Sequence, residues 1–293
     1  MGNSKIKMVT MKISTLTPAE TMLILDADAP LKDMMKFTFM DLMAKGVLEI
    51  KEEKKEVHTR DKYGNRVIGI QRNKYILKGK NFSQYSPKPH ELIFLSIFEK
   101  TTSLKVLFKH FIQMGYENAG GKMGYRKKVL LSDSLQELIR ANFFQRILGK
   151  FHLTGKGKET QSEILNQLKP IDEEIEYLMQ HDKEKAFELL LGLGGNMFLL
   201  NNFNPEFLTN IDQQFIIRQQ PYATEIETGD YIEDSWFYLN TFDFGNDSDS
   251  LFNSFDDTLN SFNSDFDAVN CSSCSSDGCN SCSSCSSCSS CSS

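Results

Sequence analysis

The residues with the clearest chemical potential are seven cysteines, all within the last 23 residues of the chain. Two to four residues, mostly serine, separate them, and the last five keep a strict three-residue period. Thiolates at Cys-x-x-Cys spacing bind soft metals tetrahedrally, so zinc or copper on the tail is one expectation. The candidate ligands, or alternatively sites of modification, are Cys271, Cys274, Cys279, Cys282, Cys285, Cys288 and Cys291.

The same residues fit three other interpretations. A serine that loses water becomes an alkene, and a nearby thiolate can add to it and close a thioether ring. Alternatively, Ser or Cys side chains can attack the preceding carbonyl and give azole-type rings. Both reactions need interleaved Ser and Cys, as in residues 279–293, and imply a tail-modifying enzyme as partner. Another interpretation is disulfide exchange, which a reducing cytoplasm opposes. The last is that replication slippage expanded a Cys-Ser-Ser repeat that has no function of its own.

The rest of the chain carries few residues in catalytic patterns. Its histidines are scattered, without partners at metal-ligand spacing, and no cysteine lies before residue 271. There is no Gly-x-Ser-x-Gly elbow and no His-Glu-x-x-His motif. We therefore expect a protein that is not an enzyme and has no cofactor beyond a metal on the tail.

Charge is distributed unevenly along the chain. Residues 1–158 hold 29 Lys and Arg against 15 Asp and Glu, whereas residues 159–293 hold 4 against 24. The basic half favours a polyanion such as nucleic acid, unless the acidic half lies against it. No apolar run of about 18 residues predicts a membrane span, and the N-terminus lacks a signal peptide's apolar core, so we expect a cytoplasmic protein.

The N-terminal elements have the outline of a winged helix. Thr17, Pro18 and Glu20 form a capping-box start, and apolar residues at three- and four-residue steps predict a helix over residues 31–45 that Gly46 ends. A strand over residues 47–50, a polar segment with a turn at residues 62–65, and a returning strand over residues 67–77 predict a hairpin. This first unit spans residues 14–80.

The pattern then occurs a second time, over residues 87–157. Pro89-His90-Glu91 matches Pro18-Ala19-Glu20, and apolar spacing predicts a helix after it, a second from residue 104 and a third over residues 131–139. Residues 150–157 match residues 74–80 in pattern. We infer an internal duplication of about 70 residues.

The remaining chain divides by composition. Residues 158–220 predict helices over 158–168 and 171–193, separated by Pro170, and a short helix over 205–215. Residues 221–270 form an acidic Asn/Asp/Ser/Phe linker, predicted mostly disordered because it has too little apolar surface to offset its ordering entropy. Its phenylalanines either bind a partner groove or lie in a solvated spacer. Residues 271–293 are the low-complexity tail.

The basic half supplies a candidate nucleic-acid interface. A wing touches the phosphate backbone, and phosphate contacts give affinity without sequence choice. The helix over residues 31–45 is mostly apolar, which favours a core helix over a reader of bases. The candidate contacts are Lys54, Lys55, Arg60, Lys62 and Arg66 of the hairpin with Lys127 and Lys128 of a later loop.

Residues 17–50 and 190–213, followed by a Cys/Ser tail, resemble an uncharacterised bacterial family. In that family a helical domain precedes a Gly/Ser/Cys-rich low-complexity tail that has suggested modified, bacteriocin-like peptides. Many members are membrane proteins, and this chain departs from them by lacking a span. Helix order and Leu-rich runs are also similar to bacterial Golgi phosphoprotein 3-like proteins. That family's lipid-binding residues have no match here, so the resemblance supplies no site.

Together these observations predict a mainly α fold with small β-hairpins, a tandem winged-helix-like body followed by a disordered tail. The expected function is non-enzymatic: the body presents the Cys/Ser tail for modification or for metal binding by thiolates. The alternative is a winged-helix nucleic-acid-binding protein that uses the basic half.

Overall fold

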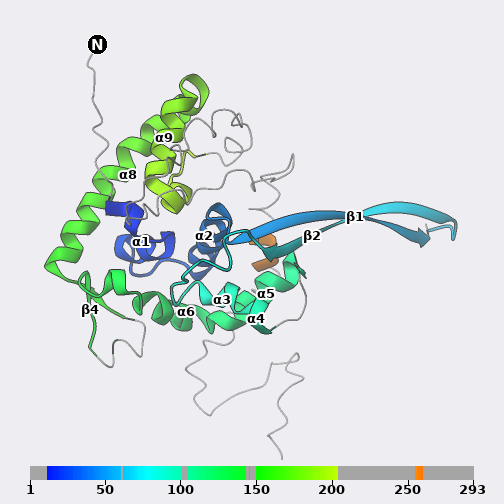
Figure 1. Ribbon diagram of the computed structural model, residues 1–293, viewed down its shortest axis with the longest axis horizontal. Helices are drawn as coiled ribbons and strands as arrows, with labels where there is room; N and C mark the ends of the chain where they lie inside the picture. The colour runs from blue at the N-terminus through cyan, green and yellow to red at the C-terminus, as the bar shows by residue number, and fades with distance from the viewer. Residues whose placement is uncertain are drawn as a thin grey trace, which may run out of the picture.

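Helices build most of the chain that the computed structural model describes, namely residues 12–60, 62–100, 105–142, 145, 150–203 and 255–259 (Figure 1). Three 3-10 turns, Lys12–Thr15, Asp133–Leu135 and Gly194–Leu199, supplement them. The elements in chain order are α1 (Pro18–Leu25), α2 (Leu31–Ala44), β1 (Leu48–Arg60), β2 (Arg66–Lys78), α3 (Leu92–Leu95), α4 (Ile97–Lys100), β3 (Lys105–Leu107), α5 (Phe108–Ala119), α6 (Gly121–Leu130), β4 (Ile139–Arg140), β5 (His152–Leu153), α8 (Gly155–His181) and α9 (Lys183–Leu193).

The first two helices begin where they were predicted. The Thr17 hydroxyl accepts from the Glu20 amide, and the Glu20 carboxylate accepts from the Thr17 amide, which completes a capping box with Pro18 at the first helical position. Helix α2 ends one residue before the predicted boundary, and Gly46 follows it with a φ of 63°. Most of α2 is buried, which confirms that it is a core helix.

The hairpin is longer than predicted. Instead of short strands joined by a polar segment, β1 and β2 pair antiparallel over their whole length, from Leu48↔Lys78 to Arg60↔Arg66. The turn at residues 62–65 is where the sequence placed it. Strand β3 adds to β2 through three residue pairs, so the hairpin has three strands at its root and two beyond it.

The second unit differs from its predicted elements in three places. The segment after Pro89 forms two short helices, α3 and α4, and residues 105–107 form strand β3 before helix α5. The predicted helix over residues 131–139 is wrong, because α6 ends at Leu130 and a 3-10 turn and β4 follow. Leu131 is 64% exposed, so it does not belong to an apolar helix face. The closing hairpin, β4–β5, has only two residue pairs.

The predicted break at Pro170 is also wrong. Helix α8 runs unbroken through it to His181, and the real break is Asp182, whose carboxylate caps α9 by accepting from the Lys185 amide. Buried residues continue across the proline at helical spacing, so packing on one face holds the helix together despite the missing amide donor. These residues are Ile164, Leu168, Ile171, Ile175 and Leu178.

A single cluster of buried apolar side chains joins all these elements, with α2 near its centre. Phe39 of α2 lies with ring centroids 5.8 Å from Phe94 of α3, 5.9 Å from Phe108 and 6.1 Å from Phe111 of α5. This aromatic group ties the helices before the hairpin to those after it. The division into domains at residues 80, 157 and 220 stays a prediction.

Residues 255–259 form a short helix, which corrects the prediction of a disordered spacer for this stretch of the linker. Phe255 and Leu259 are 1% and 5% exposed, and the Phe255 ring lies 5.6 Å from Phe39. The predicted helix over residues 205–215, the other linker residues and the Cys/Ser tail lie outside the described residues. No helix in the described portion of the chain is long and apolar enough to cross a membrane.

Candidate nucleic-acid interface

The β1–β2 hairpin is an arm that projects away from the helical body (Figure 1). Its outer segments, residues 54–60 and 66–72, carry five cationic side chains and one carboxylate, that of Glu56. An isolated two-stranded ribbon is marginally stable in water, so an arm of this length needs a firm root. It presents its side chains on two faces, which alternate along each strand.

One face of the arm is both basic and apolar. Residues directly opposite in an antiparallel ladder share a face, and the register pairs Lys54 with Arg72 and Arg60 with Arg66. These two cation pairs lie six residues apart, about 20 Å. Between them, Ile68 and Ile70 are 63% and 68% exposed. We call this surface, made of Lys54, Glu56, His58, Arg60, Arg66, Ile68, Ile70 and Arg72, the arm face.

Like charges directly opposite each other destabilise a sheet. The ion pair that relieves Arg72 is weak, because its Nε lies 3.9 Å from Glu52 Oε1 and both side chains are solvent-exposed. An anion between two opposed cations would remove the repulsion. The arm face is therefore arranged to bind anionic groups at two separated points.

The tip adds an exposed aromatic ring. Lys62 Nζ lies 5.1 Å from the centroid of the Tyr63 ring, which is 76% exposed. Aromatic rings stack on nucleobases with little regard to sequence, because every base has a π-face. A cation held beside the ring supplies a phosphate contact at the same place.

The root of the arm is fixed to the body. Leu48 and Ile76 are completely buried. Lys105 of β3 pairs with Glu53 and lies 4.5 Å from the centroid of the Tyr75 ring. A Cβ at Gly79 would collide with the Gly46 carbonyl oxygen, so glycine is needed where the chain leaves β2.

The structure brings only some of the predicted interface together. Lys54, Arg60 and Arg66 lie on the arm face, Lys62 lies at the tip, and Lys55 lies on the opposite face of the ribbon. Two predicted contacts, Lys127 and Lys128, belong to α6 on the body, away from the arm (Figure 1). Arg72, a further basic residue of the hairpin, lies opposite Lys54 on the arm face.

A second group of ionisable residues is buried beneath α1. His90 is fully buried, with Nε2 3.0 Å from Thr17 Oγ1 and Nδ1 3.4 Å from Ser132 Oγ. Glu20 accepts from Lys88 Nζ at 2.7 Å and from Ser134 Oγ at 2.6 Å. Burial lowers the pKa of His90 to about 3, so the ring is neutral. Burial, the largest single cause, would raise the pKa of Glu20, but the charges of Lys88 and His90 and the hydrogen bonds from Lys88 and Ser134 together lower the pKa below its ordinary value.

A neighbouring group centres on Lys45. Its ammonium lies 2.7 Å from Asp41 Oδ2 and 3.7 Å from Glu91 Oε1. Burial, the main cause, raises the pKa of Glu91, to which Tyr85 donates a hydrogen bond at 2.8 Å. Each of these side chains has a hydrogen-bond or ion-pair partner in the protein, and the Asp41 and Glu91 carboxylates are buried. The His90 group and the Lys45 group therefore act as buried polar connections between elements of the body.

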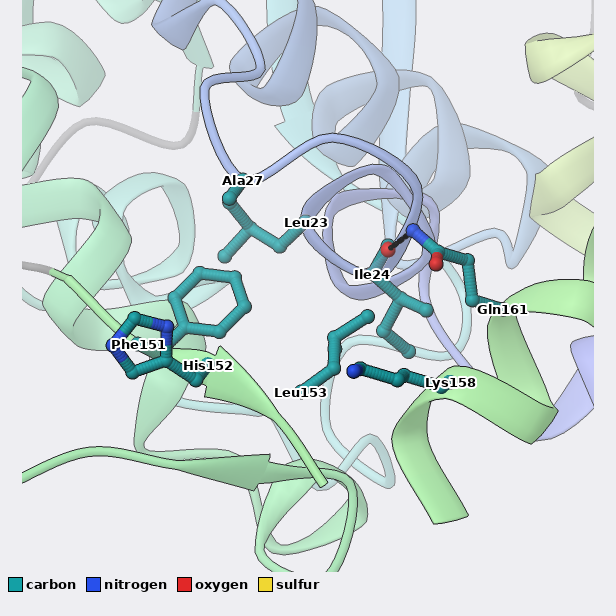
Figure 2. A pocket seen from close by; sticks show the side chains of 8 residues that line it. All are labelled: Leu23, Ile24, Ala27, Phe151, His152, Leu153, Lys158 and Gln161. Carbon is teal, nitrogen blue, oxygen red and sulfur yellow. Dashed lines mark hydrogen bonds between the residues drawn. The ribbon is translucent and has the colours of Figure 1, made fainter. Parts of the chain in front are cut away.

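Figure 2 shows a cavity of about 440 Å³ between the end of α1, β5 and the start of α8. Its wall combines apolar side chains, from Leu23, Ile24, Phe151 and Leu153, with the polar side chains of His152, Lys158 and Gln161. The Gln161 amide donates to the carbonyl oxygens of Ile24 and Leu25, so it joins two helices. Among the described residues that line the cavity there is no carboxylate, serine or cysteine, and the ionisable side chains are those of His152 and Lys158.

No group of three or more His, Cys, Asp or Glu side chains within the described ranges is placed to hold a metal ion. The seven predicted cysteine ligands lie outside those ranges. Comparison with family models, curated proteins and solved structures finds no match for this chain.

Proposed function

We propose that this chain is a non-enzymatic nucleic-acid-binding protein and that the arm face is its contact surface. The observation that carries the proposal is the pairing of Lys54 with Arg72 and of Arg60 with Arg66 on one face of a projecting ribbon. The major groove of a duplex admits a two-stranded ribbon, and apolar side chains such as Ile68 and Ile70 can wedge between base steps.

The contacts of the arm face with nucleic acid supply affinity more than sequence specificity. Lysine and arginine neutralise phosphates and release counterions, so affinity falls steeply as salt rises. Arginine can also bind guanine in the major groove by two hydrogen bonds. The arm face presents three arginines, one lysine and the nearby Tyr63 ring, a set suited to the backbone with some stacking on unpaired bases.

The test measures binding of the full chain to a labelled 20-base-pair duplex and to a labelled single strand, by fluorescence anisotropy at several salt concentrations. The arm variant is Arg60→Glu, Arg66→Glu and Arg72→Glu together. Its control is Lys150→Glu, Lys169→Glu and Lys183→Glu, which makes the same change in net charge at exposed positions of the body. We expect the arm variant to bind at least ~10-fold more weakly, with the salt slope for the duplex smaller by about 2–3, the value for three lost phosphate contacts.

The control variant should retain a binding constant within about threefold of the wild type, because its charges lie outside the interface. Equal weakening by the two variants would show that net charge alone drives binding. No binding of the wild-type chain to either nucleic acid at low salt would remove the proposal.

A second proposal concerns the tail and rests on the three-residue cysteine period. We propose that the body presents residues 271–293 either to a modifying enzyme or to zinc or copper. Modification by dehydration would lower the mass of the natively expressed chain by multiples of about 18 Da and leave fewer than seven titratable thiols. A metal-binding tail would keep its sequence mass and seven thiols and release metal on acidification, because protons compete for thiolates. Sequence mass, seven thiols and no metal would contradict both versions.

A further inference from the structure

Residues 255–259 lie against one face of α2, far along the chain from the body they contact. Lys32, Lys36 and Phe39 follow each other at steps of four and three residues, so they share a helix face. Phe255 packs on Phe39, and Asp256 lies between the two lysines, with Oδ2 2.9 Å from Lys36 Nζ and Oδ1 3.5 Å from Lys32 Nζ. We call this face of α2, made of Lys32, Lys36 and Phe39, the socket.

The socket matches its occupant in both shape and charge. Phe255 and Leu259, one helical turn apart, are buried, whereas Asp257 between them is exposed. The short helix thus presents one apolar edge and one paired carboxylate, the pattern of a peptide that docks into a groove. Its sequence, Phe-Asp-Asp-Thr-Leu, stands in a linker with no Lys or Arg between residues 219 and 293, so the two basic residues of α2 are complementary to the whole segment.

The docked segment adds Phe255 and Leu259 to the buried core but is itself a small element. It is a helix of little more than one turn, and isolated helices of this length do not persist in water. Its ion pairs are partly solvent-exposed, and such pairs contribute little. Its order therefore depends on contact with the socket, and this small contact is suited to opening and closing.

We propose that the socket is a docking site for a short acidic helix with an aromatic anchor, and that residues 255–259 are its built-in, releasable ligand. The proposal does not depend on nucleic-acid binding. It assigns to the linker a role that its composition alone does not show, namely that of a latch on α2.

The latch sets how far the Cys/Ser tail can reach. Cys271 lies twelve residues beyond Leu259 in the sequence, so a closed latch holds Cys271 within about 43 Å of its docking point. A closed latch therefore bounds the distance between the first cysteine of the tail and α2.

The experiment asks whether an emptied socket accepts the segment as a separate peptide. The full chain carries Phe255→Ala and Leu259→Ala, and the probe is a fluorescein-labelled peptide of residues 250–262. We expect this variant to bind the peptide and the wild-type chain to bind it at least tenfold more weakly, because its socket is already filled. Adding Lys36→Glu should abolish binding, and Asp256→Lys in the peptide should restore it.

Asp256→Lys in the full chain provides a second way to open the latch, by repulsion from Lys32 and Lys36 while both apolar anchors are kept. Circular dichroism and the melting temperature verify that each variant is folded. Failure of both opened chains to bind the peptide, or indifference of binding to Lys36→Glu, would overturn the proposal. A concentration-dependent dimer of the wild-type chain, lost with Phe255→Ala and Leu259→Ala, would assign the socket to a second copy and overturn the latch within one chain.

Discussion

His90 and Glu91 are neighbours in the sequence whose pKa values move in opposite directions. Burial disfavours the charged form of each, so it lowers the pKa of His90 to about 3 and raises the pKa of Glu91 above its ordinary value. Burial thus shifts each equilibrium toward the neutral form. Around them lie Glu20, Lys88 and Lys45, with Thr17, Ser132 and Tyr125 against the His90 ring.

This burial makes stability depend on pH. Below the ordinary pKa of 6.5, the unfolded chain protonates His90 and the folded chain does not, until the pH approaches 3. The free energy of unfolding should therefore decrease as pH falls through this window, by up to about 1.4 kcal/mol per unit. Urea unfolding of the wild type and of His90→Gln between pH 5 and 7.5 measures how the free energy of unfolding changes with pH. We expect the variant to lack the decrease at low pH.

Glu91 acts in the opposite direction, because its raised pKa gives stability that is lost as pH rises above 4.5. Glu20, with its lowered pKa, gives stability that is lost only as pH falls below 4.5. The comparison of wild type with His90→Gln isolates the histidine from both. Equal pH slopes for the two proteins would show that folding does not lower the pKa of His90.

Gly195 tests the packing around the buried Lys45 group. A Cβ at this position would collide with Asp41 Oδ1, so Gly195→Ala must displace a carboxylate that is paired with Lys45. We expect a loss of about 1–3 kcal/mol in the free energy of unfolding. Gly155→Ala is the matched control, since nothing lies within 4 Å of its Cβ, and should leave stability unchanged or raise it by up to ~1 kcal/mol. A neutral Gly195→Ala would contradict this packing.

At the scale of elements, local signals in the sequence predicted where helices start and stop better than they predicted the lengths of the strands. The capping box at Thr17 and the left-handed Gly46 depend only on nearby residues, and both were found as predicted. The length of β1 was not predictable from hydrophobic alternation, because residues 51–56 are Lys and Glu with both faces of the ribbon in solvent. The contact between Glu20 and Lys88, 68 residues apart, has no local signal at all.

Helix α8 shows a signal that was present but outweighed. The apolar spacing from Ile164 to Leu178 continues through Pro170 and indicates one long helix, whereas the rule against interior proline indicates two. The long helix forms because its apolar face packs against the body on both sides of Pro170. In the linker, the Phe255 contact needed knowledge of the socket on α2, which only the folded body forms.

Replacing this proline should stabilise α8. Pro170 is exposed and has no amide to donate to the carbonyl of Asn166, which is also exposed. Pro170→Ala restores the hydrogen bond without loss of packing, so we expect the free energy of unfolding to rise by about 1–3 kcal/mol. Thermal and urea unfolding measure the change, and Lys169→Ala is the adjacent control, expected within ~0.5 kcal/mol of the wild type. Destabilisation by Pro170→Ala would mean that the proline fixes a bend that the packing requires.

At the scale of the whole molecule, charge and architecture combine. The basic half of the sequence builds the arm and the N-terminal helices of the body. The acidic half contributes most of α8, all of α9 and a segment that docks through Lys32 and Lys36. The charge asymmetry gave two expectations: that the basic half binds a polyanion, or that the acidic half lies against it. The first concerns the arm face and the second concerns the socket. The arm face is available to a partner, and the socket is filled by the chain itself.

Shortening the arm tests the central claim most directly. Glu53 and Asn73 are opposite each other in the ladder, so an Asn-Gly turn can join them in place of residues 54–72 and leave the three-stranded root intact. We expect the melting temperature of the shortened chain to stay within a few degrees of the wild type, and its affinity for labelled duplex and single-stranded nucleic acid to fall at least ~10-fold. A folded, shortened chain that binds nucleic acid as tightly as the wild type would contradict the assignment of the arm as the binding surface.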